Sequence, residues 1–168
     1  VTSPIMLITA LCIKLYDGGP VFYTQDRLTR DGKVFKVYKF RSMKTDAEKD
    51  GVARLAGEHD DRITPVGRVI RKVRIDELPQ LLNILKGDMS IVGPRPERPE
   101  LAAENEKIMP EFRYRLKVKA GLTGYAQVLG KYNTTPYDKL RLDLMYIEQY
   151  SLLLDIKLIL MTIKILFI

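Results

Sequence analysis

The sequence contains one cysteine and one histidine, and each scarcity excludes a class of site. Cys12 alone can form neither an internal disulfide nor a cysteine-based zinc site, which suits a reducing compartment. The histidine, His59, stands beside Asp60 and Asp61, but one imidazole with two sequential carboxylates has poor geometry for a metal site. We expect a solvated loop there.

A long apolar run is also missing, although both ends of the chain are apolar. A helix over residues 4–16 would reach only about 20 Å, whereas the hydrocarbon core of a bilayer is about 30 Å thick. Ser3-Pro4 breaks the helical hydrogen-bond ladder, which a membrane tolerates where neighbours satisfy the freed carbonyls. A soluble core helix that begins at Pro4 fits the same pattern, so both interpretations stay open.

The C-terminal segment 152–168 is predicted to be a helix that lies in the membrane interface rather than a span. Lys157 and Lys164 are seven residues apart and share one helical face, while nearly all other positions are apolar. Such lysines reach lipid headgroups with their charged ends while their stems stay in apolar surroundings.

Basic residues outnumber acidic ones, 28 against 21, for a formal net charge of +7. This excess predicts an anionic partner, which could be nucleic acid, an acidic membrane surface or a phosphorylated substrate. No RNP, helix-turn-helix or zinc-finger signature accompanies it, so no nucleic-acid partner is expected. At 168 residues, the chain 1–168 is predicted to form a single domain.

The expected fold is mixed α/β and mainly helical. Strands are predicted at 21–23 and 34–40 around a turn at Asp31-Gly32, which together make a small β-hairpin. The stretch 44–65 is polar and is predicted to be a surface helix and loop, and 137–168 is helical by its apolar spacing.

Residues 97–120 carry mixed charge, and a helix is predicted there that breaks before Pro110. Over 113–119, basic residues alternate with apolar ones, which predicts a strand with one cationic face. That face could line a phosphate site, contact lipid headgroups or simply be solvated.

The most informative stretch is 66–99, where a basic helix is followed by a second, apolar one. The basic residues at helical spacing share one face: Arg68, Arg71 and Lys72. Asp76 is predicted to cap the second helix, with Pro79 in its first turn and Gly87 as its C-terminal stop. An ionised Asp76 would then lie where a helix N-terminus and several cations converge, a place that gathers phosphates. An Asp-Glu pair at a helix start is more often a cap than a catalytic group, so spacing alone leaves both interpretations open.

Several segments resemble one enzyme family, the bacterial sugar transferases, also called monotopic phosphoglycosyl transferases. They are 71–83 (RKVRIDELPQLLN), 86–90 (KGDMS), 93–96 (GPRP), 38–43 (YKFRSM) and 121–127 (GLTGYAQ). The last departs at Tyr125, where family members commonly have tryptophan. The resemblance implies transfer of a sugar 1-phosphate from a UDP-sugar to undecaprenyl phosphate, with release of UMP.

By this resemblance, Asp76 is the catalytic nucleophile. Glu77 is then the protein ligand of a required Mg²⁺, or alternatively the base for the incoming lipid phosphate. Arg71 and the rigid corner at 94–96 are expected to hold phosphate or nucleotide. The full set of expected substrate-binding residues is Lys39, Arg41, Arg71, Pro94, Arg95, Pro96 and Asp143.

The resemblance also implies a place at the cytoplasmic face of the bacterial inner membrane. Residues 1–16 would be the second limb of a re-entrant helix bent at Ser3-Pro4, with the first limb missing from this chain. The sequence leaves the sugar and the oligomeric state open, a homodimer included. A rival interpretation, a non-enzymatic basic module on anionic membranes, explains the charge and the apolar ends but neither the acidic pair nor the Pro-Arg-Pro corner.

Overall fold

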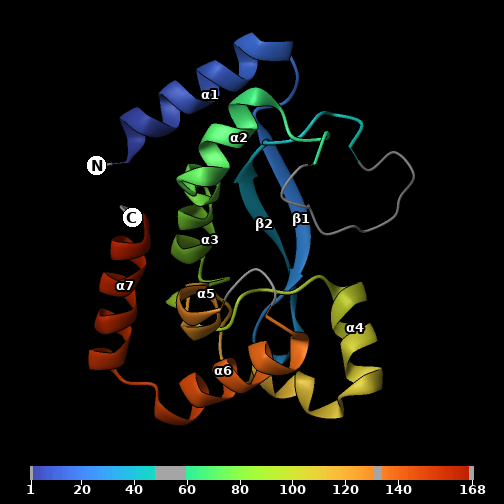
Figure 1. The fold of residues 1–168 in the computed structure, drawn as a ribbon, viewed down its shortest axis with the longest axis vertical. Coiled ribbons are helices and arrows are strands. Elements are labelled where there is room, and N and C mark those ends of the chain that lie inside the picture. The colour runs from blue at the N-terminus through green and yellow to red at the C-terminus, as the bar shows by residue number, and fades with distance from the viewer. Residues whose placement is uncertain (1, 48–59, 131–133, 167–168) are drawn as a thin grey trace. The chain divides into compact units, whose positions relative to one another are not determined.

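The computed structural model describes residues 2–47, 60–130 and 134–166 (Figure 1). The fold is mixed α/β and mainly helical with a small β-hairpin, as the sequence predicted. His59 and most of the predicted polar loop lie outside the described residues. Within the described ranges, no helix has both the length and the apolar character that crossing a bilayer requires.

The chain divides into two compact units, the first made of residues 1–24 and 38–80 and the second of 25–37 and 81–168. The hairpin strands β1 (Phe22–Leu28) and β2 (Val34–Phe40) pass from one unit to the other. They pair side by side (Figure 1). This pairing confirms the predicted hairpin, although the first strand, predicted at 21–23, is longer. The turn between the strands holds Asp31 and Gly32 at φ angles of 61° and 72°.

In the first unit, α1 (Ser3–Asp17) is the helix predicted at the N-terminal end. Pro4 stands in its first turn, where a missing N–H breaks no helical hydrogen bond. Gly18 ends the helix with a left-handed backbone at φ 71°. The inward side of α1 packs Ile13 against Phe40 and Ile70, and this cluster forms the core of the unit.

The predicted basic helix is α2 (Pro65–Lys72). The Thr64 side chain caps it by accepting a hydrogen bond from the Gly67 N–H at 2.9 Å. Arg71 and Lys72 lie in its last turn, where cations favour the negative end of the helix dipole.

The prediction that Asp76 caps the second helix is wrong. Residues Ile75–Glu77 form a separate 3-10 turn, η2, closed by the Leu78 N–H, which donates to the Ile75 carbonyl at 3.1 Å. The helix α3 (Gln80–Lys86) begins only after Pro79, because proline has no N–H with which to continue a helical ladder. Gly87 ends α3 as predicted, with φ at 84°.

The second unit contains a short parallel pair, β3 (Ser90–Val92) and β4 (Gly121–Thr123). The sequence did not predict it, because strands this short show no usable period. Gly93 and Gly121 let the two segments approach closely, and a Cβ on Gly121 would clash with the main chain of Gly93. The pair thereby fixes the chain where the Pro-Arg-Pro corner begins.

The helix α4 (Pro99–Ile108) ends before Pro110, as predicted. The following segment is a 3-10 helix, η3 (Pro110–Lys117), so the predicted strand is wrong. A period of three residues places Phe112 and Arg115 on the same side, and both are buried. Burial of these two side chains, rather than the alternation of charge, decides the conformation.

The helical C-terminus predicted over 137–168 is confirmed by α6 (Pro136–Gln149) and α7 (Leu152–Leu166). A further short helix, α5 (Tyr125–Leu129), precedes them and was not predicted. The buried Leu158 of α7 packs with Val92 and Tyr146. The Tyr146 hydroxyl also donates a hydrogen bond to the Asp155 carboxylate at 2.8 Å. These contacts attach α7 to α6 and to the parallel pair.

Candidate active site

The acidic pair, Asp76 and Glu77, lies on the η2 turn of the first unit. Arg74, just before it, has a left-handed backbone at φ 53°, which is uncommon for a residue with a side chain. The Arg74 N–H donates to the Arg71 carbonyl, and the Arg74 carbonyl accepts from the Glu77 N–H, each at 3.2 Å. These bonds turn the chain after α2 and leave Asp76 half-buried and Glu77 buried.

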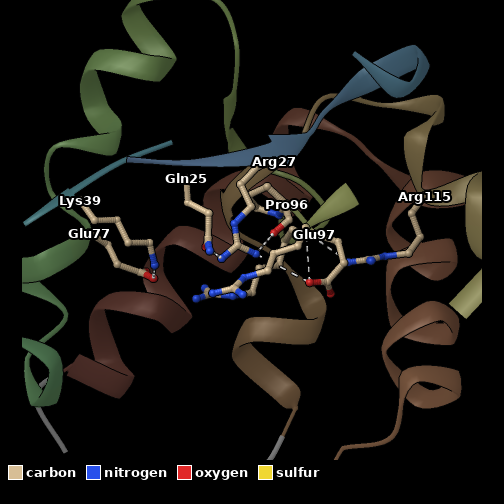
Figure 2. Close-up of polar contacts among 9 residues, drawn as sticks. Gln25, Arg27, Lys39, Glu77, Pro96, Glu97 and Arg115 are labelled. Carbon is tan, nitrogen blue, oxygen red and sulfur yellow. Dashed lines mark hydrogen bonds and ion pairs between the residues drawn. The ribbon is translucent and has the colours of Figure 1, made fainter. Parts of the chain in front are cut away.

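Lys39 of β2 meets Glu77 in the same unit. The ammonium group donates to the Glu77 Oε1 at 2.8 Å, and the side chains are 19% and 11% exposed, respectively. Figure 2 shows the two side chains pointing toward one another. Because water screens such a pair weakly, it fixes the orientation of the Glu77 carboxylate. Two predicted site residues are thus in contact, while their roles stay predictions.

Arg41 is buried and is directed at the end of α1. Its guanidinium donates to the Asp17 carboxylate and lies against Gly19, where an added Cβ would clash with it. The hydrogen bond from Arg41 and a second from the Gly19 N–H lower the pKa of Asp17 below the ordinary value of 3.8. Arg41 therefore holds the end of α1, and its predicted contact with substrate stays a prediction.

The predicted site residue Arg71 is half-buried in the last turn of α2.

In the second unit, the Pro-Arg-Pro corner is held by its main chain. Each carbonyl from Pro94 to Glu97 accepts a hydrogen bond from another segment of the unit. In the order of these carbonyls, the donors are the Gly121 N–H at 2.8 Å, the Arg115 guanidinium at 2.9 Å, the Arg27 guanidinium at 3.2 Å and the Leu28 N–H at 2.9 Å. Arg95 is exposed, whereas Pro94 before it is buried.

Asp143 of α6 forms a buried ion pair with Arg115 of η3. The Arg115 Nε donates to the Asp143 Oδ2 at 2.6 Å, and its guanidinium also stands 4.7 Å from the centre of the Phe112 ring. Asp143 is 1% exposed, and burial raises the pKa of its carboxyl, although the charge of Arg115 opposes this shift. A carboxylate this deeply buried can influence the corner through Arg115.

Arg27 of β1 is held in a comparable way (Figure 2). Its Nη2 donates to the Gln25 Oε1 at 2.6 Å, and its Nη1 lies 3.7 Å from the Glu97 Oε1 as well as donating to the Pro96 carbonyl. The carbonyls of the predicted site residues Arg95 and Pro96 are thus held by two arginine side chains that the sequence did not place there, while the Pro94 carbonyl is held by the main chain of Gly121. For Arg115, its position three residues after Phe112 could have indicated a buried role.

The carboxylates of Asp76 and Glu77 could contribute to a magnesium site. Among the described residues, no three His, Cys, Asp or Glu side chains gather into a group that could hold a metal ion. Mg²⁺ seldom needs such a cage, because it is usually bound by one or two carboxylates together with waters and substrate phosphates. The adjacent Asp76 and Glu77 on one turn provide carboxylates of that kind.

The model of one protein family, described as bacterial sugar transferase, matches residues 1–168. The chain belongs to the bacterial sugar transferase family. This membership confirms the resemblance carried by the acidic pair and the Pro-Arg-Pro corner.

Curated relatives carry more specific names. The chain is 45% identical over 165 residues to the UDP-N-acetylgalactosamine-undecaprenyl-phosphate N-acetylgalactosaminephosphotransferase of Aeromonas hydrophila, which covers 96% of this chain and 39% of that protein. It is 42% identical over 166 residues to the UDP-glucose:undecaprenyl-phosphate glucose-1-phosphate transferase of Escherichia coli (strain K12), covering 96% of this chain and 36% of that protein. The exopolysaccharide production protein PSS of Rhizobium leguminosarum bv. phaseoli is 40% identical over 168 residues, covering 95% of this chain and 84% of that protein. The first two similarities each span little more than a third of the relative's length.

Proposed function

We propose that the chain is a phosphoglycosyl transferase that moves a sugar 1-phosphate from a UDP-sugar to undecaprenyl phosphate and releases UMP. The observation that carries the proposal is the acidic pair on its turn, with Lys39 bound to Glu77, in a member of the bacterial sugar transferase family. The names of the Aeromonas hydrophila and Escherichia coli relatives, which specify undecaprenyl phosphate as acceptor, support the same reaction class. On this proposal, residues 1–168 act as one catalytic domain.

In the first step, an oxygen of the Asp76 carboxylate attacks the phosphorus that carries the sugar. The bond from this phosphorus to the oxygen of UMP breaks, UMP leaves with that electron pair, and an aspartyl-phosphosugar remains on the protein. The half-buried position of Asp76 suits this role, because it limits hydration of the carboxylate while leaving it within reach of a ligand.

A carboxylate that approaches a diphosphate is repelled, so positive charge must offset the reacting groups. Glu77 would hold an Mg²⁺ ion, and when bound this ion would neutralise charge on the diphosphate. Lys39 orients the Glu77 carboxylate by its 2.8 Å hydrogen bond. Glu77 acting as base toward the lipid phosphate is the alternative role.

In the second step, a phosphate oxygen of undecaprenyl phosphate attacks the same phosphorus, and the Asp76 carboxylate leaves. The product is a lipid-linked diphosphosugar, and the free Asp76 carboxylate is restored. Arg71 at the end of α2 and Arg95 at the corner are proposed to hold substrate phosphates, and the guanidinium fork suits phosphate oxygens.

The two terminal helices fit the membrane surface that a lipid substrate requires. Both present apolar side chains outward as well as inward: Ile5, Leu7, Ile8, Leu11 and Leu15 on α1, and Leu152, Leu153, Ile156, Leu160 and Ile163 on α7 are exposed. Exposed apolar surface of this kind marks a membrane or protein interaction site. We propose that α1 is the second limb of a re-entrant helix and that α7 lies in the interface, at the cytoplasmic face of the bacterial inner membrane.

Nucleotide release tests the proposal. Detergent-solubilised protein is incubated with Mg²⁺, undecaprenyl phosphate and each of a panel of UDP-sugars, beside the Asp76→Asn variant. The expected product is UMP with at least one sugar, with a loss of at least a thousandfold in the variant. Release of UDP would indicate ordinary glycosyl transfer and contradict the mechanism. Membrane binding without turnover of any donor would favour the non-enzymatic basic module.

A further inference from the structure

Four successive carbonyls, from the Pro-Arg-Pro corner to Glu97, accept hydrogen bonds from other segments of the unit. The donors to the carbonyls of Pro94 and Glu97 are main-chain N–H groups, whereas the carbonyls of Arg95 and Pro96 are bound by guanidinium groups. We propose that Arg115 and Arg27 are positioning residues that fix these two carbonyls and so direct the exposed Arg95 guanidinium at a phosphate of the nucleotide sugar. This inference rests on the proposed function and deepens it by adding residues that prepare the phosphate site.

The Arg115–Asp143 pair is costly to bury, and stability alone does not explain it. Removing two charges from water is unfavourable, and apolar residues of similar volume often stabilise a protein at least as well. The geometry offers another reason: the Arg115 fork uses Nε for the Asp143 carboxylate and Nη2 for the Arg95 carbonyl. Asp143 thus sets the plane of the guanidinium, and the guanidinium sets the position of the corner.

Arg27, on β1, binds the next carbonyl, that of Pro96, in the same way as Arg115 binds the Arg95 carbonyl. Its two terminal nitrogens are divided between the Pro96 carbonyl and the Gln25 side chain, and the Glu97 carboxylate lies nearby. A neutral carbonyl at a half-buried loop could be satisfied by water. Two charged donors on successive carbonyls instead make bonds that are stronger and more directional.

The consequence for Arg95 is a main chain that is fixed before any ligand arrives. Its neighbours Pro94 and Pro96 restrict the backbone further, since proline locks its own φ and limits the residue before it. Binding a phosphate then requires no ordering of the Arg95 main chain, so less conformational entropy is lost on binding. Asp143 enters this scheme as a positioning residue that acts through Arg115.

A double-mutant cycle on UMP affinity tests the inference, because binding does not require turnover. Calorimetry in Mg²⁺ and detergent would compare the native chain, Arg115→Lys, Arg95→Ala and the double variant. Lysine keeps a positive charge beside Asp143 but replaces the planar fork by a single ammonium, so it cannot reproduce the geometry in which Nε and Nη2 each bind one partner. We expect Arg115→Lys to weaken UMP binding about tenfold, equal to about 1.4 kcal/mol. In the Arg95→Ala background, the further loss should be less than twofold.

Two further variants and a stability measurement serve as controls for this experiment. Arg141→Lys, at an exposed position on α6, is the matched control and should leave UMP affinity unchanged. Arg27→Lys provides a second cycle at a less buried position, and it carries the test if Arg115→Lys fails to fold. Thermal unfolding of each variant identifies losses that come from global destabilisation.

Each outcome decides the inference. A loss of UMP affinity that requires Arg95 supports it. An equal loss in both backgrounds overturns it, because Arg115 would then act on the ligand directly or through general stability. An unchanged affinity in Arg115→Lys also overturns it. A native chain that binds no UMP contradicts the proposed function itself and the inference with it, whereas additive variants on a chain that binds UMP contradict the inference alone.

Discussion

At the scale of single residues, the contact between Lys39 and Glu77 is the most direct link between the predicted site and the fold. Lys39→Met removes the ammonium and leaves a mostly buried carboxylate without that hydrogen bond. We expect a loss of about 2 kcal/mol in the free energy of unfolding, because the Glu77 carboxylate loses its charged partner while most of its desolvation cost remains. Urea unfolding measures it, with Lys36→Met, at an exposed position of the same strand, as the control. Equal stability of the two variants would show that the contact contributes nothing.

The Asp17 carboxylate predicts a dependence of stability on pH. Its pKa is lowered in the folded state from 3.8, chiefly by the hydrogen bond from Arg41. A group of this kind stabilises the fold above its unfolded pKa, and the contribution is lost as pH falls below 3.8 through the folded value. Asp17→Asn should therefore be less stable than the native chain at pH 6, and the difference should shrink on acidification below pH 3.8. Thermal melts of both proteins across this range provide the check, and a difference that does not change with pH would refute it.

At the scale of secondary-structure elements, the turn that presents the acidic pair contains a conformational strain. Arg74 has a left-handed backbone at φ 53° between α2 and η2. A side chain in that conformation costs about 1 kcal/mol relative to glycine. Arg74→Gly should thus be more stable than Arg74→Ala by about 1 kcal/mol, since both variants lose the same side-chain contacts. Chemical unfolding compares the two, and an alanine variant as stable as the glycine variant would contradict the assignment of strain.

The elements also show what could be predicted from the sequence and what could not. Strong local signals were sufficient for the hairpin at Asp31-Gly32 and for the helix stop at Gly87. The helix start at Asp76 was misjudged because Pro79 terminates a short turn rather than opening a long helix. The strand expected over 113–119 failed because packing of Phe112 and Arg115 overrides the alternation of charge.

The candidate site likewise contains motifs that the sequence revealed and contacts that it did not. The acidic pair and the Pro-Arg-Pro corner were picked out by their resemblance to a family, and the family match confirms that the chain belongs to that family. Contacts between residues distant in sequence, such as Arg115 with Asp143 and with the Arg95 carbonyl, could not be read from spacing. Such contacts depend on tertiary packing, which a single sequence pattern does not encode.

At the scale of the whole molecule, the proposal requires the chain to bind a lipid surface through its apolar helices. Leu153 and Leu160 of α7 are 78% and 61% exposed. Replacing both by serine should lower the partition coefficient onto anionic lipid vesicles about tenfold or more, since burial of one leucine side chain contributes about 1.5–3 kcal/mol. Sedimentation with vesicles measures the partition, and Gln149→Ser, at an exposed position of α6, is the control. Unchanged partition of the double variant would remove α7 from the membrane-binding surface.

The central claim is that Asp76 is the nucleophile, and the covalent intermediate tests it most directly. The protein is incubated with Mg²⁺ and the UDP-sugar that gives turnover, without undecaprenyl phosphate, and its intact mass is measured. The account predicts an added mass of one sugar phosphate, mapped to Asp76 in the peptide that contains η2, lost on addition of undecaprenyl phosphate and missing from Asp76→Asn. UMP release without an adduct, or an adduct that persists in Asp76→Asn, would contradict the assignment of Asp76 as the nucleophile.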